Sequence, residues 1–73
     1  MNEKLKVLIV EDSLSFALEL EALIHKIGYT TQAILDTAEA ALKWIDKNPP
    51  DIILLDIELK GEMSGIDLSK SIS

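Results

Sequence analysis

The chain has 73 residues, which is one domain at most, and a domain of this size buries only about 60% of the surface that its unfolded chain exposes. Hydrophobic residues make up 48% of the sequence, too many for a disordered tail, and the absence of cysteine excludes a disulfide framework or a cysteine–zinc site. Acidic residues outnumber basic ones 13 to 7 and the lysines form no stripe, so we expect no direct nucleic-acid partner.

Residues 5–10 (LKVLIV) form a short, nearly continuous apolar run that is rich in β-branched side chains. This pattern predicts a strand buried on both faces of a parallel sheet. The run is far shorter than the roughly 20 apolar residues that cross a bilayer, and no small-residue cleavage site follows it. We therefore expect a cytoplasmic protein without membrane association.

The next segment predicts a helix that ends at Gly28, a residue suited to the left-handed position after a helix. Asp12 or Ser13 can cap its start. Large apolar residues recur in it at spacings of four, three and four, which marks one apolar face. These residues are Phe16, Leu20, Leu23 and Ile27, with Ala17 and Ile24 beside them.

Residues 29–35 have the composition of a second, weaker strand. Asp36 followed by Glu39 resembles a capping box, so we expect Asp36 to cap a second helix. That helix ends near Asn48, because Pro49 and Pro50 cannot continue it. Its predicted inward stripe consists of Ala38, Ala41, Leu42 and Ile45.

Residues 51–56 (DIILLD) are another apolar run, framed by acids, and predict a third buried strand. Gly61 and Gly65 indicate a loop, and the apolar residues after it begin a third helix that includes Ile66, Leu68 and Ile72. The strict β-α-β-α-β-α alternation favours an α/β fold with a parallel sheet.

Glu11, Asp12 and Asp56 all follow the carboxyl ends of predicted strands, which is the edge where open parallel sheets bind ligands. If the second and third strands lie on either side of the first, an order (2-1-3) known from other doubly wound folds, the three carboxylates would line one crevice. Clustered carboxylates repel each other unless they are protonated or share a cation, and oxygen ligands that leave room for phosphate suit Mg²⁺. One carboxylate could then attack a phosphoryl group while the metal neutralises its charge.

These features resemble the receiver domain of two-component response regulators. Residues 7–13 (VLIVEDS) are similar to the family's first strand and acidic pair, and residues 51–57 (DIILLDI) to its third strand and phosphorylated aspartate. Leu59, Gly61 and residues 65–68 (GIDL) resemble the loop and helix start that follow. The resemblance implies a flavodoxin-like fold, a doubly wound parallel sheet with strand order 2-1-3.

The resemblance also implies roles for particular residues. Asp56 would accept a phosphoryl group from a histidine kinase or a phosphotransfer protein, and it would bind Mg²⁺ together with Glu11 and Asp12. Glu58 would offer its backbone carbonyl to the metal, while its side chain influences how long the phosphate persists. The expected protein is a signalling module and not an enzyme.

Two departures from the family pattern concern the loop and the length. Lys60 stands where many members have proline, in a loop one residue longer than the commonest form. A complete receiver needs about five strand–helix units, so residues 1–73 are expected to be an incomplete receiver domain without its C-terminal half. The family's phosphate-contacting Ser or Thr, its Lys and its switch aromatic have no counterparts in the chain.

Several residues have simpler interpretations. His25, late in the first predicted helix, is assigned no role, and Trp44 is expected to be a half-buried packing residue. Lys43, Lys47 and Lys70 are expected on the solvated surface, and Lys60 is not taken as the missing active-site lysine.

Three functions compete. The first is the phospho-acceptor switch at Asp56. The second is a half-receiver that cannot switch and self-associates, because the third strand of a 2-1-3 sheet presents an open edge. The third is an aspartate-nucleophile phosphohydrolase of another α/β fold, which is disfavoured because such enzymes want an aspartate where Glu58 stands.

Overall fold

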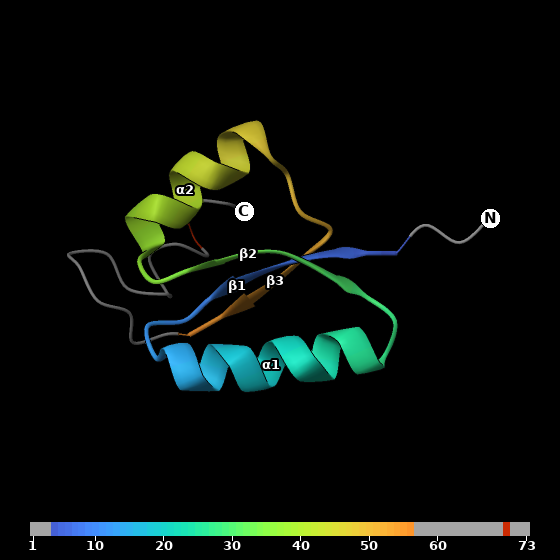
Figure 1. Ribbon diagram of the computed structural model, residues 1–73. Coiled ribbons are helices and arrows are strands. Elements are labelled where there is room, and N and C mark those ends of the chain that lie inside the picture. The colour runs from blue at the N-terminus through green and yellow to red at the C-terminus, as the bar shows by residue number, and fades with distance from the viewer. Residues whose placement is uncertain (1–3, 57–69, 71–73) are drawn as a thin grey trace.

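The computed structural model describes residues 4–56 and residue 70. Its elements in chain order are β1 (Lys6–Val10), α1 (Leu14–Lys26), β2 (Thr30–Leu35), α2 (Ala38–Lys47) and β3 (Ile52–Leu55). The three strands are parallel and adopt the order β2-β1-β3 (Figure 1). The expected α/β class and the flavodoxin-like strand order are confirmed. Of the expected third helix, only Lys70 is described, and it is helical and exposed.

The core forms on both faces of β1, because successive side chains of a strand point to opposite sides of the sheet. Leu8 and Val10 belong to one buried cluster, and Val7 and Ile9 belong to another. The first cluster is completed by Ala38 and Ala41 of α2, and the second by Ala17 and Ile24 of α1. The two helices accordingly cover opposite faces of the sheet (Figure 1). Full burial of a valine, leucine or isoleucine stabilises a fold by about 1.5–3 kcal/mol, so β1 is the centre of the structure.

Helix α1 has a defined cap at each end. The side chain of Ser13 accepts a hydrogen bond from the N–H of Phe16 at 3.4 Å, so Ser13 is the N-cap. After the helix, Gly28 adopts a φ of 96°. The N–H groups of Gly28 and Tyr29 donate to carbonyls of the last helical turn at 3.0 Å each, which is the Schellman arrangement. The predicted role of Gly28 is therefore confirmed.

The sheet covers only one flank of the apolar face predicted for α1. Ala17 and Ile24 are buried, whereas Phe16, Leu23 and Ile27 remain 49%, 59% and 66% exposed. Small and branched side chains therefore make the contact with β1, and larger ones lie beside it. Within residues 4–56 and at residue 70, no helix has the length and apolarity that crossing a membrane requires.

Helix α2 begins one residue later than the sequence indicated. The N-cap is Thr37, whose hydroxyl accepts from the N–H of Ala40 at 3.1 Å, so the expectation that Asp36 caps this helix is wrong. Thr37 has the extended backbone typical of an N-cap, which places its hydroxyl over the first turn. The predicted stripe is confirmed, with Ala38 and Ala41 buried and its two larger members packed against them.

Trp44 connects α2 to β2. Its ring is partly buried against the first core cluster, as expected. Its indole N–H donates to the side-chain oxygen of Gln32 at 2.9 Å. This bond satisfies the polar end of a ring whose remaining atoms are apolar, so Trp44 fixes the position of α2 on the sheet.

Candidate functional site

The candidate site lies where β1 and β3 end side by side. The parallel pairing aligns Val10 with Leu55, so the residues that follow them, Glu11 and Asp56, are also neighbours. The N–H of Asp56 donates to the carbonyl of Val10 at 2.9 Å. On the other side, the N–H of Glu11 donates to the carbonyl of Leu35 at 2.8 Å. Backbone hydrogen bonds therefore fix the backbone positions from which both acidic side chains extend.

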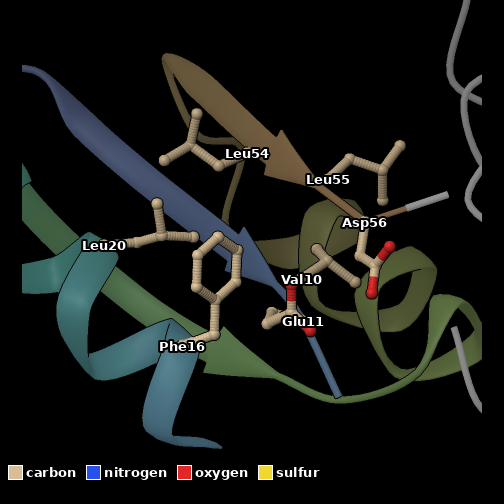
Figure 2. A pocket seen from close by; sticks show the side chains of 7 residues that line it. All are labelled: Val10, Glu11, Phe16, Leu20, Leu54, Leu55 and Asp56. Atoms are coloured by element: carbon tan, nitrogen blue, oxygen red, sulfur yellow. The ribbon is translucent and has the colours of Figure 1, made fainter. Parts of the chain in front are cut away.

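Three carboxylates meet at this edge. Oxygen atoms of Glu11, Asp12 and Asp56 all lie within 4.8 Å of one another. Glu11 is buried, with 8% of its surface exposed, and the two aspartates are partly buried. Figure 2 shows Glu11 and Asp56 on the same side of one pocket. The predicted convergence of these residues is therefore observed in the structure.

The acidic cluster perturbs Glu11 most clearly. The N–H of Ser13 donates to Oε2 of Glu11 at 3.0 Å, and this bond alone would lower the pKa of the carboxyl group. Burial raises the pKa, as do hydrogen bonding with Asp12 and the charge and hydrogen bonding of Asp56. The net effect is a pKa raised above its ordinary value of 4.5. Without a cation beside it, the ionised form of Glu11 is therefore disfavoured.

The donor set fits Mg²⁺. Two oxygens that bind the same Mg²⁺ directly lie at most about 4.2 Å apart, twice the usual bond length. The separations among these oxygens, all within 4.8 Å, are close to that limit, so the three carboxylates could share one ion directly or through water. The cluster consists of hard carboxylate oxygens and has no nitrogen or sulfur donor, so it does not favour a softer metal ion. Glu58, the further ligand expected from the resemblance, lies outside the described residues.

A pocket of about 360 Å³ adjoins the acids. Its walls are Val10, Glu11, Phe16, Leu20, Leu54, Leu55 and Asp56 (Figure 2). Five of these side chains are apolar, so the surface beside Asp56 on this side is mostly nonpolar. The sequence analysis did not assign Phe16 and Leu20 to the site. Both residues lie in the first two turns of the helix that begins just after the acidic pair, and this position could have indicated that they are near the site.

Four residues without an expected role, His25, Lys43, Lys47 and Lys70, are exposed in the structure. His25 is exposed near the end of α1, and its Nε2 lies 3.2 Å from the hydroxyl of Thr31 on β2. The side chains of Lys43, Lys47 and Lys70 are exposed, as expected. Lys60 lies outside the described residues.

Comparison with known proteins agrees with this geometry. The family model of the response regulator receiver domain matches residues 7–73. A protein-glutamate methylesterase/protein-glutamine glutaminase of Paramagnetospirillum magneticum is 42% identical over 76 residues, covering 99% of this chain and 20% of that protein. The sensory transduction protein RegX3 of Mycobacterium tuberculosis is 44% identical over 66 residues, covering 90% of this chain and 28% of that protein.

A solved structure shows the same arrangement. The receiver domain of the response regulator PhyR from Erythrobacter litoralis matches with a TM-score of 0.86 and 32% sequence identity. The match covers 94% of this chain and 54% of that domain. The chain thus spans about half of this solved receiver domain and less than a third of the two curated relatives.

Proposed function

Since this chain belongs to the response regulator receiver domain family of two-component signalling, we propose that Asp56 accepts a phosphoryl group while Glu11 and Asp12 hold Mg²⁺. The observation that carries the proposal is the meeting of the three carboxylates within 4.8 Å at one sheet edge. The donor is a histidine kinase or a phosphotransfer protein. Glu58 supplies a backbone carbonyl to the metal in this proposal. Family membership favours signalling over the hydrolase alternative.

The proposed transfer makes one bond and breaks one. A carboxylate oxygen of Asp56 attacks the phosphorus of a phosphohistidine, the P–N bond breaks, and the leaving imidazole nitrogen takes up a proton. The product is an acyl phosphate on Asp56. Mg²⁺, when bound, neutralises charge on the phosphoryl oxygens. Glu11 and Asp12 remain unreacted, and the hydrogen bond from Ser13 to Glu11 holds that carboxylate in place.

The test is the intact mass of the protein after incubation with acetyl phosphate and Mg²⁺. We expect one phosphoryl adduct that disappears in Asp56→Asn and in the presence of a chelator. Asp46→Asn is the matched control, because Asp46 is an exposed aspartate on α2 and should leave labelling unchanged. Equal labelling of Asp56→Asn and the unaltered chain would place the acceptor elsewhere.

A second candidate is self-association through the edge of β3. Among residues 4–56, β3 pairs with β1 on one side and with no strand on the other, which supports this proposal. An unpaired edge can pair with an identical strand of another copy. A proline at Ile53, in the middle of the strand, would block such pairing. The expected result is a loss of oligomer, measured by light scattering, with the helical circular dichroism retained.

A further inference from the structure

Ser13 connects the acidic site to the start of helix α1. Its N–H donates to Oε2 of Glu11 at 3.0 Å, and this bond is partly buried. Its carbonyl oxygen accepts from the N–H of Ala17 at 2.9 Å, and its hydroxyl accepts from the N–H of Phe16 at 3.4 Å. Ser13 thus holds the carboxylate with its N–H and the first turn of the helix with its two oxygen atoms.

The bonds to the helix set the backbone conformation of Ser13. As the N-cap, Ser13 has an extended backbone with a φ of −91° and a ψ of 109°. Ala17, at the other end of the carbonyl bond, is fully buried in the core cluster beneath α1, so this end of the connection is fixed by packing. Because the peptide unit is planar, the direction of the N–H of Ser13 follows from this backbone conformation.

Glu11 needs such a bond to keep its place in the acidic cluster. Its side chain has several rotatable bonds, and the like charges of Asp12 and Asp56 repel it. A hydrogen bond from a backbone N–H to an ionised carboxylate is about twice as strong as one between neutral groups, so it opposes this repulsion. An oxygen of Glu11 accordingly stays within 4.8 Å of oxygens of both aspartates. A carboxylate that is oriented in advance loses less entropy when a ligand binds.

We propose that Ser13 is a positioning residue for the Mg²⁺ site and that its hydroxyl acts on this site through the first turn of α1. The inference rests on the proposed function, because it takes Glu11 as a partner of the metal. The hydroxyl holds the first turn, the backbone of that turn directs the N–H, and the N–H orients the carboxylate. Metal binding and the start of α1 are therefore coupled, and by linkage each stabilises the other.

The test is the dissociation constant of Mg²⁺, measured by titration calorimetry at a temperature at which circular dichroism shows every variant folded. Ser13→Ala should weaken binding by up to about fivefold, the factor by which the loss of an ordinary cap shifts the first turn. Ser13→Thr should keep the original affinity, because Thr37 serves as a cap in this fold. Thr37→Ala is the matched control and should leave the affinity unchanged, because the bond that it breaks, to Ala40, involves no carboxylate.

The converse effect is measured by hydrogen exchange of single amides, followed by NMR. The amides of Phe16 and Ala40 both lie in the first turn of a capped helix, where exchange occurs by local opening. Mg²⁺ should slow the exchange of Phe16, because the ion and the cap of α1 stabilise the same turn. It should leave the exchange of Ala40 unchanged.

Several results would overturn the positioning role while leaving the metal site intact. They are an equal Mg²⁺ affinity in Ser13→Ala and the unaltered chain, an equal loss in Ser13→Ala and Thr37→Ala, and a Ser13→Thr variant as weak as Ser13→Ala. An equal effect of Mg²⁺ on the two amides would also count against it. If the unaltered chain bound no Mg²⁺, the proposed function itself would be refuted, and the positioning role with it.

Discussion

The backbone N–H of Asp56 donates to the carbonyl oxygen of Val10, one residue before Glu11, at 2.9 Å. The pairing of β1 with β3 therefore sets how far apart the backbone positions of the two carboxylates lie. Repulsion between these groups is part of the native state and is opposed by the packing of the strands beneath them.

Glu11→Gln should make the protein more stable than the unaltered chain at pH 7 in the presence of a chelator. The pKa of Glu11 is raised in the folded state, so folding favours the protonated carboxyl group over the ionised one. The stability that the protonated group provides is therefore complete below about pH 4.5 and is lost as the pH rises through the folded-state pKa. The difference in unfolding free energy between the two proteins should widen over that interval, which urea denaturation at a series of pH values measures. A difference that is constant with pH would contradict this expectation.

Mg²⁺ should stabilise the unaltered chain because it compensates the charges of Glu11, Asp12 and Asp56. At ten times its dissociation constant, the ion adds about 1.4 kcal/mol to the unfolding free energy. Thermal unfolding with MgCl₂, compared with NaCl at equal ionic strength, separates this effect from screening. Asp12→Asn should reduce the shift, and an equal shift in both salts would count against a specific site.

Thr37→Ala should cost about 1 kcal/mol, because it removes the acceptor for the N–H of Ala40 at the start of α2. Asp36→Ala is the matched control and should change stability by less than about 0.5 kcal/mol, since Asp36 is exposed and outside the cap. Urea denaturation compares the two variants. The reverse order of effects would mean that Asp36 caps the helix after all.

Gly28→Ala should destabilise the chain by about 1–2 kcal/mol, because a residue with a Cβ is strained at a φ of 96°. No atom lies within 4 Å of the position that a Cβ would occupy, so the cost comes from the backbone and not from a clash. Gly28→Asn should cost less, since asparagine tolerates this conformation better. Thermal midpoints of the two variants provide the comparison, and equal losses would indicate a steric cause.

The fold was predictable from the sequence because its signals are local. The apolar run of β1 and the glycine after α1 can each be recognised from a few neighbouring residues. The cap of α2 was not predictable with certainty, because Asp36 and Thr37 are both good capping residues and the backbone leaving β2 decides between them. Spacing also identified the apolar face of α1, but the part that stays exposed depends on where the sheet ends.

The meeting of Glu11, Asp12 and Asp56 followed from strand order and could be anticipated. The hydrogen bond from Ser13 to Glu11 could not, because it depends on the geometry of a turn that no residue pattern specifies. The pocket next to Asp56 could not be predicted from the sequence either, since Phe16 and Leu54 come from elements far apart in the chain and meet only in the folded structure.

The bond between Trp44 and Gln32 gives the molecule a built-in optical probe. The chain has one tryptophan, and its indole sits between α2 and β2, on the face of the sheet opposite α1. When it is excited at wavelengths that Tyr29 does not absorb, its fluorescence therefore reports the detachment of α2. Circular dichroism detects both helices, so a fluorescence change that precedes the loss of helical signal would reveal that the two faces of the sheet come apart in sequence.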